Sequence, residues 1–143
     1  MNITLEQADA VIAATLNEAR NRNVKPLAVM ILDSGGHPVA FRREDHASLF
    51  RYDIAKAKAA GALGMGSDTK ALAERAAKNP TFFNSLSAVT NGNIVFAPGG
   101  VLVKNTNAEI IGAIGISGDT GEVDEICARA GITAAGLQHG ESL

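Results

Sequence analysis

Residues 42–50, with the sequence RREDHASLF, contain the densest group of chemically versatile side chains in the chain. Two arginines, two carboxylates and one histidine follow one another, and apolar residues flank them on both sides. Guanidinium groups bind carboxylates in a bidentate manner, and imidazole serves as a base or a metal ligand. If the segment is a polar connection that starts a helix, Arg43 and Asp45 simply pair at the surface. If it holds a ligand, Asp45 orients Arg43 or His46 toward a pocket, and His46 and Asp45 are the candidate catalytic residues.

The other motifs give weaker indications of chemistry. His37, His46 and His139 form no H-x-x-x-H or H-E-x-x-H pair, so the sequence predicts no metal site. Cys127 is the single cysteine, which excludes an internal disulfide and a four-cysteine zinc site. It lies on an apolar stripe, which predicts a buried and inert thiol. Residues 115–119 resemble a G-x-S-x-G nucleophile elbow, but Asp replaces the last glycine.

A second place for a ligand is the end of the last long predicted strand, at Ser117 and Gly118. The chain there leads into a helix that is capped near Asp119. Backbone N–H groups at the start of a helix bind carboxylates or phosphates when they have no other partner. The alternative is that Asp119 itself accepts hydrogen bonds from these N–H groups.

The elements that must position these residues are predicted from hydrophobic spacing and capping patterns. Helices are expected at 4–22, 49–63 and 69–78 and after Asp119, with an anchoring turn at Phe82, Phe83 and Leu86. Strands are expected at 27–33, 38–43, 94–97, 101–104 and 109–117. The continuous apolar run at 27–32 predicts a strand covered on both faces, and short turns predict antiparallel pairing. The expected fold is therefore α+β: an α-β-α sandwich with a five-stranded antiparallel sheet, forming one domain over residues 1–143.

Composition excludes several classes of protein. The formal net charge is −2 and no basic stripe is present, so nucleic-acid binding has no electrostatic support. The longest apolar run, 27–32, is too short to cross a bilayer, so no membrane partner is expected. The first residues contain neither a basic region nor an apolar region typical of a signal peptide. With only one cysteine, these observations predict a cytoplasmic protein.

Four stretches of sequence resemble one known family. They are AVMILDSGGHPVAFRRED (28–45), DIAKAKAAGALGM (53–65), APGGVLV (97–103) and IIGAIGISGDTGEVDEICARAGI (110–132). Their order and spacing resemble the GlcG/HbpS-like haem-binding family, which includes the C-terminal domain of the PduO corrinoid adenosyltransferases. The resemblance implies a profilin-like five-stranded antiparallel sheet with helices on both faces. It also implies dimers or larger homo-oligomers, and some members bind haem or corrinoids.

The resemblance also indicates where a ligand would bind. It places Arg43, Asp45 and His46 in a motif beside the helix that carries Lys58. The glycine loop at Gly99 and Gly100 and the strand end at Ser117 and Gly118 complete the expected ligand-binding set. His46 stands where glycine is common in the family, and Leu102 stands where proline is common. An imidazole at position 46 is suited to bind haem iron or to act as a base, and it also fills space that a planar tetrapyrrole needs.

Two classes of function follow. The first is a cytoplasmic homo-oligomer that binds haem, a corrinoid or a small anionic metabolite as an accessory to catabolism. The second is an enzyme acting on a small carboxylated metabolite by hydrolysis, hydration or tautomerisation. In that enzyme His46 or Asp45 is the base, and Arg43 or Lys58 holds the carboxylate. A structural subunit of a catabolic complex, with no ligand, is the third possibility. No metal is expected, apart from haem iron at His46.

Overall fold

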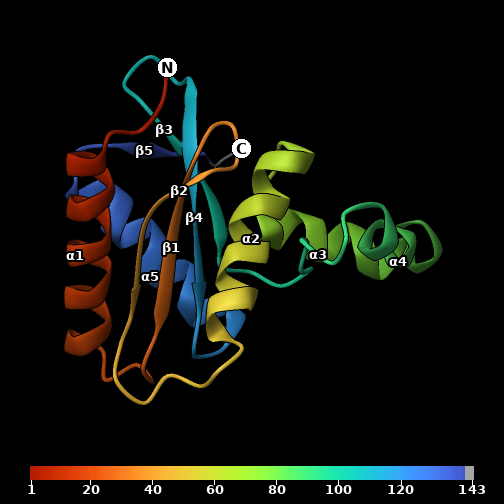
Figure 1. Ribbon diagram of the computed structural model, residues 1–143, viewed down its shortest axis with the longest axis horizontal. Coiled ribbons are helices and arrows are strands. Elements are labelled where there is room, and N and C mark those ends of the chain that lie inside the picture. The colour runs from red at the N-terminus through yellow and green to blue at the C-terminus, as the bar shows by residue number, and fades with distance from the viewer. Residues whose placement is uncertain (141–143) are drawn as a thin grey trace.

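The computed structural model describes residues 1–140, and Figure 1 shows how their helices and strands are arranged. In chain order the elements are α1 (Leu5–Asn21), β1 (Ala28–Asp33), β2 (Pro38–Arg43), α2 (Arg51–Met65), α3 (Thr69–Lys78), α4 (Pro80–Val89), β3 (Gly100–Lys104), β4 (Ile110–Ser117), α5 (Gly121–Ala134) and β5 (Gln138–His139). The first helix is capped by Thr4, as the capping pattern predicted. Its hydroxyl accepts the Gln7 N–H, and the Gln7 side chain accepts the Thr4 N–H.

The strands form one five-stranded sheet in the order β2-β1-β4-β3-β5, and every neighbouring pair is antiparallel. Helices α1 and α5 cover one face of the sheet, and α2 covers the other (Figure 1). This arrangement confirms the expected α-β-α sandwich. At one end of the sheet Ala28 pairs with Arg43 on one side and with Ser117 on the other. Paired residues in a sheet share a face, so Arg43 and Ser117 both lie on the α2 face.

The two faces of the sheet are packed differently. Large aliphatic residues such as Ile12, Ile31 and Ile114 fill the side covered by α1 and α5. On the other side, alanines of α2 bring its backbone close to β4. A Cβ atom added at Gly115 would lie 1.9 Å from the carbonyl oxygen of Ala55, so only glycine allows this approach. The alanine and glycine patterns of the sequence therefore explain the close packing of α2.

Helices α3 and α4 project away from the sheet (Figure 1). The sequence predicted only an anchoring turn where α4 lies. Pro80 instead occupies the first position of a new helix, where its missing N–H is not needed. The ring of Phe83 is buried and packs edge-to-face against Phe82 and Phe96. Within residues 1–140, no helix is both long enough and apolar enough to cross a membrane.

The strand predicted at 94–97 is wrong, and the fifth strand lies elsewhere. Ile94 is buried against α2, where its Cγ1 would lie 2.8 Å from a Cβ atom added at Gly61. Packing on the helix therefore replaces pairing in the sheet for this segment. The open edge of β3 pairs instead with β5, through Val103 with His139 and Lys104 with Gln138. A strand of two residues gives no periodic pattern, so the sequence did not predict it.

Candidate functional site

The segment RREDHASLF forms a pocket at the corner where β2 ends. The pocket has a volume of about 520 Å³. It is lined by Arg20, Pro26, Arg43, Glu44, Asp45 and His46, and we call it the corner pocket. The three predicted residues Arg43, Asp45 and His46 therefore line the same pocket, and each has an exposed side chain. Among the described residues, Arg43 and Asp45 do not form the surface ion pair that the first interpretation required.

Glu44 holds the corner pocket in place. Its backbone N–H donates to the carbonyl of Leu27 at 2.8 Å, and its Oε1 accepts the Leu27 N–H at 2.8 Å. The same carboxylate pairs with Arg20, at 3.0 Å between Nε and Oε2. These contacts join β2 to α1 and to the start of β1. Glu44 therefore lines the pocket but is engaged in structural contacts, unlike its neighbours Arg43 and Asp45.

His46 adopts a left-handed backbone conformation, with φ of 73°. Only glycine adopts this conformation without strain. Among the other residues, asparagine, aspartate and histidine adopt it most often. The tight turn is closed by a hydrogen bond from the Ala47 N–H to the carbonyl of Glu44, at 3.2 Å. Glycine is therefore the residue that this backbone favours. The imidazole of His46 stands in the pocket in spite of that preference.

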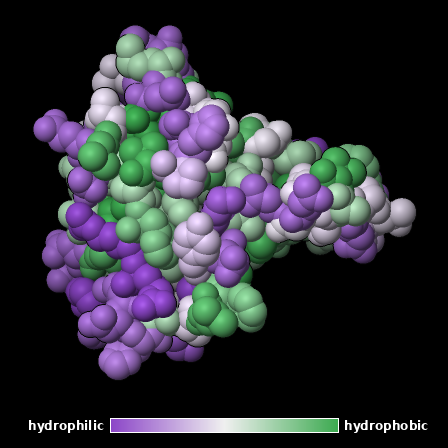
Figure 2. All heavy atoms as spheres, in the orientation of Figure 1, coloured by the Kyte–Doolittle hydropathy of each residue, from purple (hydrophilic) through white to green (hydrophobic). Residues whose placement is uncertain are grey.

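Apolar side chains lie next to the corner pocket in the chain. Leu49 and Phe50 are 74% and 66% exposed, and Tyr52 at the start of α2 is 40% exposed. Figure 2 shows a hydrophobic group at the foot of the molecule, where α2 begins in Figure 1. Tyr52 packs edge-to-face on Phe41, with ring centroids 5.0 Å apart. The corner thus presents aromatic and aliphatic surface beside its charged residues.

Lys58 belongs to a second, buried group of residues. Its Nζ donates to the carbonyl of Ile116 at 2.8 Å and to Oδ2 of Asp124 at 3.2 Å. The side chains of Lys58 and Asp124 are only 5% and 1% exposed. Burial lowers the pKa of Lys58 and raises the pKa of Asp124, and their mutual attraction opposes both shifts. Lys58 therefore links α2, β4 and α5 and does not line the corner pocket.

The glycine loop packs against the Lys58 helix. A Cβ atom at Gly99, where φ is 124°, would lie 2.9 Å from the Lys58 Nζ. At Gly100 it would lie 2.3 Å from the carbonyl oxygen of Lys58. Gly100 therefore allows two backbones to approach closely, and Gly99 leaves room for the Lys58 ammonium group. The structure brings Gly99 and Gly100 together with Lys58, away from Arg43, Asp45 and His46.

The predicted anion site at the end of β4 already contains protein partners. Ser117 is buried, and its Oγ accepts Nη1 of Arg51 at 3.1 Å. Gly118 packs on the chain at Pro26, whose carbonyl oxygen would lie 2.3 Å from an added Cβ. The Asp119 carboxylate accepts the N–H groups of Lys25 and Thr120, at 3.0 and 2.7 Å. These hydrogen bonds lower the pKa of Asp119, and the bond from Lys25 contributes most.

The other two histidines have different surroundings. His37 lies in the β1–β2 turn, where its side chain is 80% exposed and stands 3.4 Å from Asp33. His139 lies in β5 with its Nδ1 2.8 Å from Nη1 of Arg129. Burial and the Arg129 charge lower the pKa of His139. Within residues 1–140, no cluster of His, Cys, Asp and Glu is arranged to hold a metal ion.

Sequence reasoning missed the partners that fix these groups: Arg20, Arg51 and Asp124. The signals for them were local and ambiguous. Asp124 lies in the first turn of α5, where an acidic residue is favoured by the helix dipole alone. Arg51 begins α2 and looks like a solvated helix residue. Only the folded arrangement shows that Asp124 pairs with Lys58 and that Arg51 reaches Ser117.

Comparison with known proteins identifies the family. A curated protein of Citrobacter freundii, described as an uncharacterized 15.0 kDa protein in the dhaT-dhaS intergenic region, is 28% identical over 130 residues, covering 91% of this chain and 89% of that protein. The crystal structure of HbpS is 30% identical with a TM-score of 0.80, covering 93% of this chain and 89% of HbpS.

A structure of a PduOC:heme complex has the same fold, with a TM-score of 0.88 and 23% identity. The match covers 99% of this chain and 100% of that chain. The sequence model of the family described as "Haem degrading protein HbpS-like" matches residues 3–133. The resemblance predicted from the four sequence stretches is therefore confirmed, and the chain belongs to the HbpS-like family.

Proposed function

We propose that this protein binds haem in the corner pocket, with His46 as a ligand of the iron. The observation that carries the proposal is the His46 imidazole, which lines a pocket of about 520 Å³ from a backbone position that favours glycine. A residue kept in a strained conformation at a pocket supports a functional role. Membership of the HbpS-like family and the fold shared with the haem complex of PduOC support the choice of ligand.

The residues of the corner fit the chemistry of haem. Haem offers iron to an imidazole, two propionate carboxylates to cations, and a flat apolar ring to hydrophobic side chains. The corner supplies His46 for the iron and the guanidinium groups of Arg20 and Arg43 for the propionates. Arg20 already pairs with Glu44, so Arg43 is the stronger candidate for a propionate. The exposed side chains of Leu49 and Phe50 lie close by in the chain to cover the ring.

An absorption titration with haemin tests this proposal. The unmodified chain is expected to give a Soret band that shifts on binding. His46→Ala should move that band and weaken binding about tenfold or more, because iron loses its protein ligand. His37→Ala is the matched control, since His37 is exposed in a turn and lines no described pocket. Identical spectra and affinities for His46→Ala and the unmodified chain would reject His46 as the ligand.

Variants at Arg43 and His139 test the roles of the propionate contact and the iron ligand separately. Arg43→Gln should weaken haemin binding several-fold without moving the Soret band, because a propionate contact is lost while the iron ligand remains. If Arg43→Gln moves the band as His46→Ala does, the assignment of separate roles is wrong. His139→Ala should leave the spectrum unchanged, because the ring of His139 is held by Arg129.

We also propose that the protein is a cytoplasmic homo-oligomer. The exposed Leu49 and Phe50, together with Phe82 and Val89 on the projecting helix α4, support assembly, because such side chains favour burial against another surface. Sedimentation at micromolar concentration is expected to show species larger than one chain. A single-chain species alone would contradict the assembly.

A further inference from the structure

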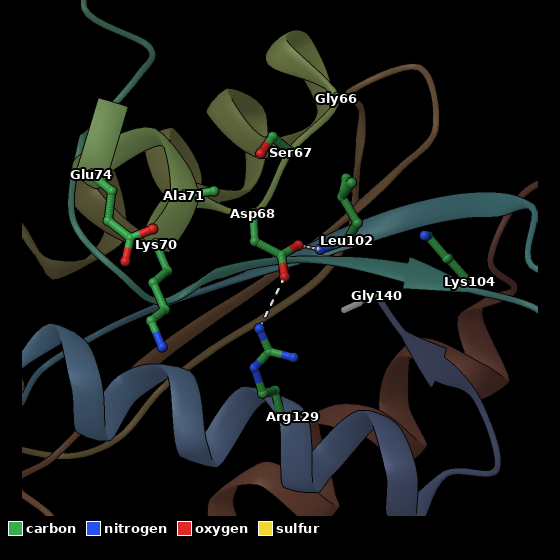
Figure 3. A pocket seen from close by; sticks show the side chains of 10 residues that line it. All are labelled: Gly66, Ser67, Asp68, Lys70, Ala71, Glu74, Leu102, Lys104, Arg129 and Gly140. Atoms are coloured by element: carbon green, nitrogen blue, oxygen red, sulfur yellow. Dashed lines mark hydrogen bonds and ion pairs between the residues drawn. The ribbon is translucent and has the colours of Figure 1, made fainter. Parts of the chain in front are cut away.

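We propose that a second pocket, between α3 and α5, binds a short-chain dicarboxylate. This α3–α5 pocket has a volume of about 370 Å³. It is lined by Gly66, Ser67, Asp68, Lys70, Ala71, Glu74, Leu102, Lys104, Arg129 and Gly140 (Figure 3). It shares no residue with the corner pocket, and strands β1 and β4 separate β2, at the corner, from β3, which borders the new pocket.

Three cationic side chains from three elements meet at this pocket. They are Lys70 from α3, Lys104 from β3 and Arg129 from α5. Figure 3 shows Lys70 and Lys104 on opposite sides of Asp68. Within residues 1–140, neither lysine has a carboxylate oxygen within 4.0 Å, so both ammonium groups are available to a ligand. Two carboxylates, Asp68 and Glu74, also line the pocket, and Arg129 is paired with Asp68 and Glu125, so the two lysines are the cations that a ligand would contact.

The carboxylate of Asp68 does not neutralise these lysines, because both of its oxygens are engaged. Oδ1 accepts the Leu102 N–H at 2.9 Å, and Oδ2 accepts Nη2 of Arg129 at 3.2 Å. Asp68 precedes α3 but makes no side-chain capping bond to it. Lys70 and Ala71, in the first turn of α3, line the pocket, and Asp68 does not cap the N–H groups of that turn. The positive end of the helix dipole adds to the charge of the lysines there.

Contacts with Glu125 and His139 hold the Arg129 side chain at the wall of the pocket. Its Nε donates to Oε2 of Glu125 at 3.1 Å, and its Nη1 contacts Nδ1 of His139 at 2.8 Å. Because arginine stays protonated, the His139 Nδ1 accepts this bond, and the lowered pKa of His139 agrees with a neutral ring. The other Oε oxygen of Glu125 is buried and has no partner within the described residues. The guanidinium group is thus held in one orientation before any ligand arrives.

The size and charge pattern of the pocket define the ligand class. A volume of 370 Å³ lies at the lower end of the range for ligand pockets, so it suits a molecule of a few carbon atoms. Two lysines on opposite sides favour two acid groups separated by a short chain over one compact anion. Glu74, which is drawn beside Lys70 in Figure 3, opposes binding of any anion by repulsion. The geometry therefore points to a small dicarboxylic acid.

Amide NMR spectra of the full-length protein test the proposal. Malonate, succinate, glutarate, acetate and inorganic phosphate are titrated separately at constant ionic strength. We expect at least one dicarboxylate to saturate the shifts of the Lys70 and Ala71 amides with an affinity about tenfold above that of acetate. Binding of phosphate as tight as that of every dicarboxylate would overturn the assignment of two separate acid groups. No saturable shift with any dicarboxylate up to about 10 mM would overturn the site itself.

Matched charge variants locate the binding. Lys70→Gln and Lys104→Gln should each weaken dicarboxylate binding about tenfold, and Glu74→Gln should strengthen it about threefold. Lys78→Gln, at the exposed far end of the same helix, should leave it unchanged. Equal losses in Lys70→Gln and Lys78→Gln would show general charge attraction and overturn the proposal. His46→Ala should not change dicarboxylate binding, and Lys70→Gln should not change the haemin spectrum, so the two proposals fail separately.

Discussion

The Lys58–Asp124 pair and the corner pocket contain similar charged residues, yet they differ in what surrounds them. Lys58 and Asp124 are almost fully buried, and their polar atoms have protein partners on β4 and at the start of α5. Arg43, Asp45 and His46 are exposed, and within residues 1–140 none of them forms an ion pair. Charges that partner one another inside a protein hold elements together, while exposed charges around a pocket remain free for a ligand. Burial and partners, more than residue type, therefore distinguish the structural pair from the proposed ligand site.

The largest expected effect comes from breaking the buried pair. Lys58→Met should lower the free energy of unfolding by about 3–5 kcal/mol, because it leaves the Asp124 carboxylate buried without its cation. Urea denaturation measures the change. Lys56→Met, on the same helix, should change stability by only about 0.5 kcal/mol. The double variant Lys58→Met, Asp124→Leu should recover most of the loss, and failure to recover would mean that the pair does more than neutralise two charges.

The next largest expected effect is a difference in stability between variants of two adjacent acidic residues in the corner, Glu44 and Asp45. Glu44→Ala should destabilise the protein by about 1–2 kcal/mol, because the Leu27 N–H and Arg20 lose their acceptor. Asp45→Ala should change stability by about 0.5 kcal/mol or less, since Asp45 has no hydrogen bond within the described residues. Thermal or urea unfolding of both variants gives the comparison. Equal destabilisation would contradict the division of this segment into one structural and one ligand-facing acid.

The sequence predicted the fold better than the site, for physical reasons that particular residues show. The apolar run at 27–32 is too continuous for a half-exposed strand, so it predicted a strand covered on both faces and, with it, the sandwich. The strand β5 depends on the free edge of β3, which no local pattern records. Lys58 lies one residue from an alanine stripe, so periodicity alone did not decide whether it is buried. Its partner Asp124 lies in the first turn of α5, where the helix dipole alone favours an acidic residue. The sequence therefore contained no indication that Asp124 pairs with Lys58.

Asp119 lies between the two regions, and its titration reports on the connection. Its carboxylate accepts the Lys25 N–H beside the corner pocket, and its own N–H donates to Asp124 at 3.1 Å. Its pKa is lower in the folded state than the ordinary value of 3.8. Between these two pKa values the unfolded chain binds more protons, so the contribution of Asp119 is complete above about pH 5 and decreases as the pH falls through 3.8 and below.

Comparison of urea unfolding at neutral and acidic pH tests whether the stabilisation by Asp119 decreases as the pH falls. Asp119→Asn should lower stability slightly at neutral pH and should lose less stability than the unmodified protein on acidification. The effect should be smaller than that of Glu44→Ala, because Asp119 is only half-buried and solvent screens its interactions. A larger acid loss in Asp119→Asn than in the unmodified protein would reverse the assigned direction. Asp45→Asn is a useful control, since Asp45 accepts no hydrogen bond within residues 1–140.

The smallest effect on stability concerns His46, and it has the opposite sign. His46→Gly should raise the free energy of unfolding by about 0.5 kcal/mol, because glycine adopts a φ of 73° without steric strain. The gain is reduced because glycine also gives the unfolded chain more conformational freedom. His46→Ala keeps the strain and should be about 1 kcal/mol less stable than His46→Gly.

Both variants should lose the haemin spectrum of the unmodified protein, since neither offers an imidazole. A protein that becomes more stable while its ligand site fails would show that the histidine serves binding and opposes folding. If His46→Gly is instead less stable than the unmodified protein by about 1 kcal/mol or more, the imidazole stabilises the corner directly. The contrast with the Lys58–Asp124 pair would then disappear, because both charged regions would be parts of the folded framework.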